Sequence, residues 1–229
     1  MEYENLLGLV QKRRSTRRFK PDPVPDELIN KVIEVARWAP SGANSQPWEF
    51  IIITDKVVKD KITEIAREAC KVVQEMEFTR SSDMQHPLAF EPVDELGFKD
   101  APVLIIEVGD PRTREAAVLA AQRGPHIYVS SLANAFLYLH LAATSLGLGS
   151  QWLSSVGHPL FQERIKQELG IPDNFTIYDV FVLGYPAEKP KERIVRGLEE
   201  IVHREGYEPA KYRSDAEVMD FARRVQLGW

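Results

Sequence analysis

The spacing of apolar residues along the chain predicts a series of helices. Leu6, Leu9 and Val10 recur at helical spacing, so residues 3–13 are expected to form the first helix. The next helix lies within residues 23–40 and is expected to stop at its final proline. Similar patterns predict further helices over residues 57–77, 127–148, 159–170, 197–207 and 215–226.

Short apolar runs between these helices predict strands. The runs are FIIIT (residues 50–54), PVLIIEVG (102–109), TIYDVFVLGYP (176–186) and a brief extended piece, SQWLSS (150–155). Because helices and strands are interspersed and helices dominate, the expected class is α+β or α/β, with a small central sheet surrounded by helices.

One stretch of the chain has no clear period. Residues 79–100 are expected to form a long loop, and loops of this length in compact domains usually act as lids or binding loops. No convincing linker is present, so residues 1–229 are expected to form one domain. The last part, residues 206–229, is a C-terminal extension whose apolar residues are expected to wrap a partner subunit, and the other interpretation is an exposed terminal helix that frays.

Composition and charge narrow the classes of function. Of 229 residues, 44% are hydrophobic and 28% are charged, which is typical of a soluble globular protein. The net charge of −5 argues against a broadly basic face that binds nucleic acid. With one cysteine, Cys70, and no signal peptide, a cytoplasmic protein is expected. The longest apolar segment, Ile127 to Leu148, contains Ser130, Asn134 and His140, so a buried helix is expected there and no membrane span.

Two basic clusters are candidate anion sites. The run RRSTRR, Arg13 to Arg18, combines four arginines with two hydroxyls. Guanidinium groups bind phosphate through paired hydrogen bonds, and Ser15 adds a short one. A second cluster, Lys189 to Arg196, follows the strand that ends in GYP. For both clusters the other interpretation is a basic surface exposed to water.

Two further segments suit a flat ligand. In the loop PSGANSQPW, Gly42 permits close backbone approach, while Ser41 and Asn44 offer donors and acceptors for a heterocycle with polar edges. An ordinary turn between a helix and a strand would use the same residue types. In SLGLGSQWLSS, residues 145–155, Trp152 is placed either to stack on a ligand or to pack in the core.

In this order and at these intervals, the four segments resemble the FMN-dependent nitroreductase family. The resemblance covers roughly residues 5–205. RRSTRRF looks like the family's Arg-Arg-Ser-x-Arg-x-Phe motif, and WAPSGANSQPWEF looks like its Ala-Pro-Ser-x-x-Asn-x-Gln-Pro-Trp segment; SLGLGSQW and VLGYP are weaker matches. The resemblance implies an α+β, nitroreductase-like fold with a small central mixed sheet, and an intertwined homodimer with FMN sites across the subunit interface.

The resemblance also implies roles for individual residues. The phosphate and the pyrimidine side of FMN would be held by Arg13, Arg14, Ser15 and Arg17. The rigid loop would lie against the isoalloxazine ring through Pro40, Ser41 and Asn44. The segment beside the reactive N5, which Ser154 would tune, would be Gln151, Trp152, Leu153 and Ser154. Either Arg193 or Arg196 would reach the phosphate, and VRG, where family members often carry Arg-x-Pro, leaves that choice open.

The implied activity is reduction of nitroaromatics, quinones or similar flat acceptors. FMN would carry the redox chemistry, with NADH or NADPH as hydride donor and ping-pong kinetics. No side chain is expected to act as nucleophile or general acid, and no metal-ligand spacing is present. The expected partners are an aromatic or quinone-like substrate and a second subunit, and the candidate substrate contacts are Ala43, His86 and Phe90.

Two other interpretations stay open. One is a dedicated enzyme of the same fold, either a reductive dehalogenase or a flavin-fragmenting enzyme. PSGA resembles the loop of the iodotyrosine deiodinase branch, but residues 64–100 contain no tyrosine for the Glu-Tyr-Lys set of that branch's lid. The other is a non-catalytic flavin-binding dimer whose lid and tail serve a protein partner.

Overall fold

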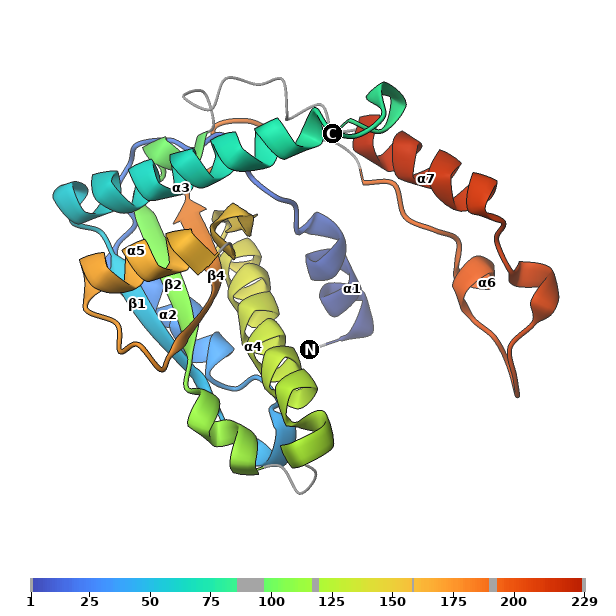
Figure 1. Cartoon of the computed structure of the whole chain (residues 1–229), viewed down its shortest axis with the longest axis horizontal. Helices are drawn as coiled ribbons and strands as arrows, with labels where there is room; N and C mark the ends of the chain where they lie inside the picture. Colours follow the sequence, from blue (N-terminus) through green and yellow to red (C-terminus); the bar gives the residue numbers. More distant parts are fainter. Residues whose placement is uncertain (1, 86–96, 117–119, 158, 190–192, 228–229) are drawn as a thin grey trace.

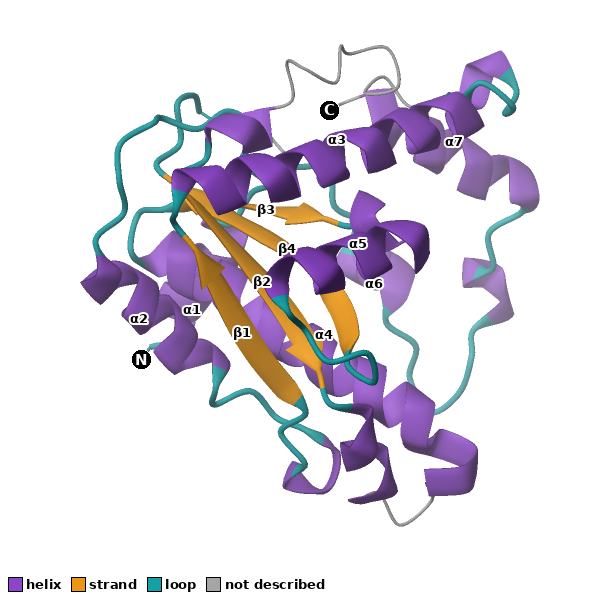
Figure 2. Ribbon diagram, turned by 60° about the vertical axis from the view of Figure 1, so that its left-hand side comes forward, coloured by secondary structure: helices purple, strands orange, loops and turns teal. Residues whose placement is uncertain are grey.

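A four-stranded sheet lies between two layers of helices (Figures 1 and 2). The strands stand in the spatial order β1-β2-β4-β3 and comprise β1 (Trp48–Ile53), β2 (Val103–Gly109), β3 (Gly149–Leu153) and β4 (Thr176–Gly184). The computed structural model describes residues 2–85, 97–116, 120–157, 159–189 and 193–227. Each strand that the sequence predicted is present, and the observed ends differ from the predicted ones by a few residues.

The sheet is antiparallel, so the expectation of a mixed sheet is wrong for its strands. All three pairings, β1 with β2, β2 with β4 and β4 with β3, run antiparallel. After β1 the next strand, β2, begins beside the end of β1 and runs back along it, so that Ile53 pairs with Leu104. The parallel contact in the described chain is an isolated bridge between Ser15 and Ser150.

One face of the sheet is covered by α3 (Lys56–Glu77) and α5 (Pro159–Leu169), as Figure 2 shows. Ile62 of α3 and Ile165 of α5 pack with Ile106 of β2 in one continuous hydrophobic cluster. Asp55 begins α3 as its N-cap, because its side chain accepts a hydrogen bond from the backbone N–H of Val58. The long helix predicted over residues 57–77 is confirmed.

The opposite face is covered by α2 (Asp26–Ala36) and α4 (Ala120–Ser145), with α1 (Tyr3–Lys12) beside α4. Phe136 of α4 packs with Ile105 of β2 and Phe181 of β4 in a second hydrophobic cluster. Ile105 and its neighbour in β2 thus face opposite layers, because successive side chains of a strand alternate between the faces. Burial on both sides explains why the two central strands read as continuous apolar runs.

Residues 124–145 of α4 are long and apolar enough to cross a membrane by length and composition. In the fold this stretch is a core helix, half buried against α2 and the sheet, as the sequence predicted. The other side of α4 carries exposed apolar residues: Val129 is 50% exposed and Leu137 is 48% exposed.

The C-terminal segment extends away from the sheet and its two helical layers (Figure 1). It contains α6 (Leu198–Ile201) and α7 (Asp215–Leu227), and Arg223 of α7 forms an ion pair with Asp83 beyond the end of α3. The helix predicted over residues 197–207 is shorter than expected. Val202 is already extended and Glu205 adopts a left-handed conformation with φ of 61°, so the helix cannot continue.

Candidate functional site

The arginine-rich segment that follows α1 runs beside the start of β3 and then beside the end of β4. Ser15 forms a parallel bridge with Ser150 at the start of β3, and the N–H of Thr16 donates to the Ser150 carbonyl at 2.8 Å. Further along, the N–H of Lys20 donates to the carbonyl of Tyr185, just after β4, at 2.9 Å. Backbone hydrogen bonds therefore fix this segment along the edge of the sheet.

Gly149 allows this close approach. A Cβ atom at position 149 would lie 2.5 Å from Oγ1 and 2.9 Å from Cβ of Thr16, distances that real Cβ contacts do not show. Glycine is therefore required where the arginine segment crosses the first residue of β3. The glycine-rich sequence before Trp152 owes part of its composition to this packing.

The arginine run is half-buried along its whole length, so the interpretation as a fully solvated basic face does not hold. Burial is the first cause that lowers the pKa of Arg13, and the neighbouring guanidinium groups of Arg193 and Arg14 lower it further. A cluster of like charges that is partly removed from water is costly unless an anion accompanies it. The cluster therefore has the electrostatic character of an anion site.

The structure distinguishes the two candidate arginines near the end of the chain. Arg193 lies close enough to Arg13 to lower its pKa. Arg196 instead turns to the C-terminal segment, where Nη2 donates to the Glu200 carbonyl at 2.9 Å and Nε lies 3.3 Å from Glu200 Oε2. Of the two, Arg193 is the one that faces the arginine segment.

Sequence reasoning missed His140 and Ser150 behind this cluster. Nδ1 of His140 lies 2.8 Å from the Ser150 hydroxyl, and both residues are buried. Burial, followed by the charge of Arg13, lowers the His140 pKa to about 3, so the ring is neutral at pH 7. A usable signal was the spacing of His140 four residues after Phe136, on the buried face of α4.

Residues of β3 present different groups on its two sides. The side-chain oxygen of Gln151 is buried and has no hydrogen-bond partner among the described residues. Trp152 is 46% exposed, and its indole N–H donates to Asp179 Oδ2 at 2.5 Å. Leu153 points into the core beneath α3, so only its backbone is available to a ligand. Ser154, just after the strand, is exposed.

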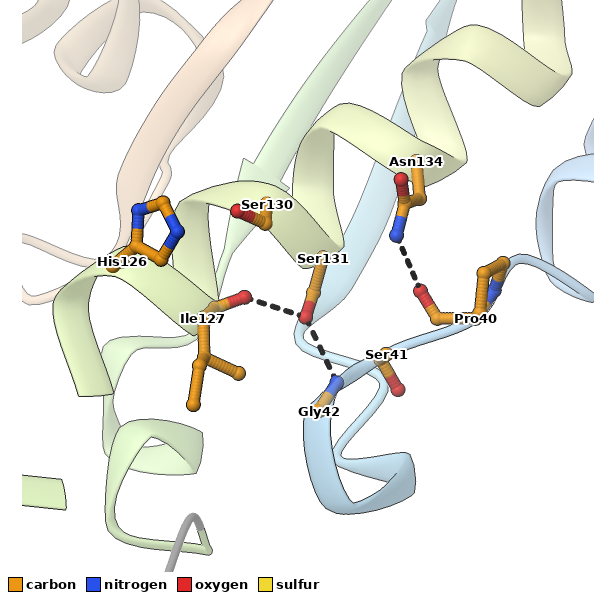
Figure 3. Close-up of a pocket in the computed structure, with 8 residues that line it drawn as sticks. All are labelled: Pro40, Ser41, Gly42, His126, Ile127, Ser130, Ser131 and Asn134. Atoms are coloured by element: carbon orange, nitrogen blue, oxygen red, sulfur yellow. Dashed lines mark hydrogen bonds between the residues drawn. The ribbon is translucent and has the colours of Figure 1, made fainter. Parts of the chain in front are cut away.

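The loop from Pro40 to Asn44 packs against the first half of α4 (Figure 3). The N–H of Gly42 donates to the Ser131 hydroxyl at 3.1 Å, and the Asn134 amide donates to the Pro40 carbonyl at 3.0 Å. A hollow of about 310 Å³ opens here, lined by Pro40, Ser41, Gly42, His126, Ile127, Ser130, Ser131 and Asn134. Polar groups of one helix face thus hold the loop in place.

The same loop has an unusual backbone. Ala43 and Asn44 have φ angles of 53° and 54°, in the left-handed region that alanine rarely adopts. The turn is held from within, because the N–H of Gln46 donates to the Ser41 hydroxyl at 3.0 Å. A Cβ on Gly42 would lie 2.0 Å from Cγ2 of Ile127, so glycine is required there too.

The predicted site residues therefore form two groups. One group comprises the arginine segment, Arg193 and β3, and it reaches α4 at His140. The other is the loop around Ser41, which reaches α4 at Ser131. These two helix positions are separated by about 13 Å along the axis of α4. His86 and Phe90, the other candidate substrate contacts, lie outside the described residues.

Comparison with known proteins identifies the family. A model of the nitroreductase family matches residues 10–185. The chain belongs to the nitroreductase family. The resemblance to this family is thereby confirmed, as is the expectation of an oxidoreductase of this family, and the second basic cluster, Lys189 to Arg196, lies outside the matched residues.

Individual members of the nitroreductase family show the same relationship. Over 193 residues the chain is 31% identical to an NADH dehydrogenase of Thermus thermophilus, covering 80% of this chain and 91% of that one. It is 30% identical to an iodotyrosine deiodinase of Thermotoga neapolitana, with 81% and 91% covered. A solved iodotyrosine deiodinase bound to FMN and 3-iodo-L-tyrosine has a TM-score of 0.68 at 26% identity, over 88% of this chain and 100% of that one.

Proposed function

We propose that this member of the nitroreductase family is an FMN-dependent oxidoreductase that uses NADH or NADPH to reduce nitroaromatics, quinones or similar flat acceptors. The observation that carries the proposal is the half-buried arginine segment fixed along β3, the strand in which the side-chain oxygen of Gln151 is buried and has no hydrogen-bond partner among the described residues. A flavin mononucleotide combines the two features that this arrangement would accommodate, a dianionic phosphate and a ring edge with a hydrogen-bond donor.

The residues fit FMN in charge and in hydrogen-bonding capacity. Arg13, Arg14, Arg17 and Ser15 would hold the phosphate and the adjoining pyrimidine side, and Arg193 would complete the phosphate site because it already faces Arg13. The side chain of Gln151 offers an acceptor that has no hydrogen-bond partner in the part of the chain that the structure describes. FMN, when bound, supplies the hydride and electron-transfer chemistry.

Other residues of β3 would shape the place where substrates bind. The exposed half of the Trp152 indole offers an apolar surface, and Ser154 offers a hydroxyl at the end of the strand. The donor NADH or NADPH and the acceptor would occupy this place in turn, which gives ping-pong kinetics. The role of the chain is to bind, orient and exclude water, and no side chain need form a covalent bond.

The proposal includes a homodimer, because one chain keeps the two groups of site residues apart. In a two-fold dimer the loop around Ser41 of one subunit would meet the arginine segment of the other, and the same patch would be buried twice. Apolar side chains exposed on a single subunit support this arrangement, and they lie on α1, α4 and the C-terminal segment: Leu6, Val10, Val129, Leu137, Val195, Leu198 and Tyr212.

An anaerobic spectrum tests the proposal most directly. The purified protein, supplemented with FMN, should show the absorption band of bound flavin at about 450 nm. NADH or NADPH should bleach this band, and a quinone or nitroaromatic should restore it. A protein that retains no flavin would contradict the proposed cofactor. A bound flavin that neither nucleotide reduces would contradict the proposed donor while leaving FMN binding intact.

Reductive dehalogenation is the second candidate function. Its support is the left-handed backbone at Ala43, within the loop that resembles the deiodinase branch, together with the similarity to iodotyrosine deiodinases. If this function is correct, the FMN-loaded protein reduced with dithionite should release iodide from 3-iodo-L-tyrosine or 2-iodophenol. Efficient turnover of quinones with no iodide release would favour the general reductase.

A further inference from the structure

Glu107 is a carboxyl group in the centre of the core. It lies in β2, is fully buried, and neither of its carboxyl oxygens has a hydrogen-bond partner among the described residues. Burial, followed by the charge of Asp179, raises the pKa of Glu107 well above its usual value. The neutral form of Glu107 is therefore favoured in the core.

Asp179 stands directly opposite Glu107 on the neighbouring strand β4. Cβ atoms of such cross-strand partners lie about 5 Å apart, and neither Glu107 oxygen forms a hydrogen bond with Asp179. On its other side Asp179 accepts the indole N–H of Trp152 at 2.5 Å, and Trp152 belongs to β3, the next strand. Three adjacent strands thus contribute one row of polar groups: Glu107, Asp179 and Trp152.

The row ends at the proposed flavin site. One side of the Trp152 ring packs on Phe136, with ring centroids 4.9 Å apart, and Tyr178 lies 6.0 Å away. Its outer part is exposed next to Gln151 and Ser154. The hydrogen bond to Asp179 is therefore the polar contact that fixes how the indole is turned in β3.

We propose that Asp179, with Glu107 beside it on β2, is a positioning residue that holds the Trp152 indole in the orientation that the flavin site requires. The inference rests on the proposed function in taking Trp152 to border FMN, but the link between the carboxyl pair and the indole is independent of it. Ionised Asp179 accepts the indole N–H of Trp152. When Asp179 gains a proton, its charge-assisted bond to Trp152 weakens.

The other ionisable groups around the pair keep one charge state near neutral pH. Burial raises the pKa of Tyr178 to about 12, and burial also raises the pKa of Tyr128 on α4. His140, whose ring centroid lies 6.4 Å from that of Trp152, has its pKa lowered to about 3, and Arg114, stacked 4.6 Å over Tyr128, is always charged. A transition near pH 6, where burial places the pKa of Asp179, therefore belongs to the carboxyl pair.

Tryptophan fluorescence of the protein without added flavin provides the first test. The signal of Trp152, taken as the difference between the native protein and the Trp152→Phe variant, should titrate once near pH 6. Asp179→Asn should remove this transition, whereas Glu49→Gln, a matched change at an exposed position on β1, should leave it unchanged. A Trp152 signal that is flat between pH 5 and 7, or that titrates equally in Asp179→Asn, would overturn the inference.

The protein loaded with FMN links the pair to function. In Asp179→Asn the dissociation constant of FMN at pH 7.5 should rise roughly three- to tenfold, and its dependence on pH between 5 and 7 should flatten. If FMN binds and is reduced normally but Trp152 does not titrate, this inference fails and the proposed function stands. If Trp152 titrates but the protein retains no FMN, the proposed function fails and the carboxyl pair still positions the indole.

Discussion

His140 Nδ1 and Ser150 Oγ lie 2.8 Å apart and join α4 to β3 directly behind the arginine segment. Ser150 also accepts the backbone N–H of Thr16 through its carbonyl, so one residue ties the helix, the strand and the arginine segment together. A charge on His140 at this point would face Arg13 in a buried environment. The neutral ring is therefore part of what keeps this region assembled.

This relationship predicts a loss of stability in acid. The His140 pKa falls from 6.5 in the unfolded chain to about 3 in the fold, so its stabilising contribution is complete above pH 6.5 and declines as pH falls towards 3. Between these two pKa values the free energy of unfolding falls by about 1.4 kcal/mol for each pH unit. In His140→Gln the free energy of unfolding, measured with urea at pH 7.5, 6 and 5, should depend less on pH. If the free energy of unfolding changed equally with pH in both proteins, the low pKa of His140 would be refuted.

Arg193 and Arg196 provide a matched pair for testing the phosphate site. Arg193→Ala should weaken FMN binding about 10- to 100-fold, the value of one charge-assisted hydrogen bond to phosphate. Arg196→Ala should change it by less than about threefold, because that side chain is already engaged by Glu200 on the C-terminal segment. Fluorescence titration with FMN measures the dissociation constants of both variants. A larger loss of affinity in Arg196→Ala than in Arg193→Ala would place Arg196 at the phosphate.

A methyl group at position 149 should disturb the same region by steric means. Gly149→Ala brings a Cβ within 2.5 Å of Thr16 Oγ1, so the free energy of unfolding should fall by about 1–3 kcal/mol. Gly8→Ala, in α1 with no atom within 4 Å of the added Cβ, should instead stabilise by about 0.5–1 kcal/mol. Adding Thr16→Ala should recover part of the loss in Gly149→Ala. Equal effects of the two glycine substitutions would show that the contact with Thr16 is unimportant.

The sequence was sufficient for most elements of the fold. Helical spacing located α3 and α5, and the apolar runs located β2 and β4, because burial on one or both faces leaves a local periodic pattern. Strand direction was not encoded in this way. It depends on where the chain re-enters the sheet, and the sheet is antiparallel where a mixed one was expected.

The site was predictable where it consists of consecutive residues. The arginine run and the loop around Ser41 each form one segment, so composition alone marked them as candidates. Contacts between distant segments left no such mark. The pairing of Glu107 with Asp179 follows from strand register, and the effect of Arg193 on the pKa of Arg13 joins two segments that lie far apart in the sequence.

The exposed side of α4 predicts how subunits associate. If Leu137, 48% exposed in one chain, is buried between two subunits, Leu137→Glu should place a charge in an apolar interface and give a monomer that retains little FMN. The matched control is Val57→Glu on α3, at a site that is 65% exposed and lies in the opposite layer. Sedimentation velocity measures the oligomeric state. A monomeric native protein, or dissociation in both variants, would contradict the proposed dimer interface.

The C-terminal helix predicts a second contribution to the same dimer. Within one subunit α7 is attached through the exposed ion pair of Arg223 and Asp83, which is worth at most about 1 kcal/mol, while Val218 and Met219 stay exposed. A second subunit under these side chains would explain why the segment folds away from the body. Ending the chain after Arg213 should then raise the dimer dissociation constant at least about tenfold, or about 1.4 kcal/mol. Arg223→Ala controls for loss of the ion pair alone, and a truncated protein that dimerises like the native one would show that α7 serves another purpose.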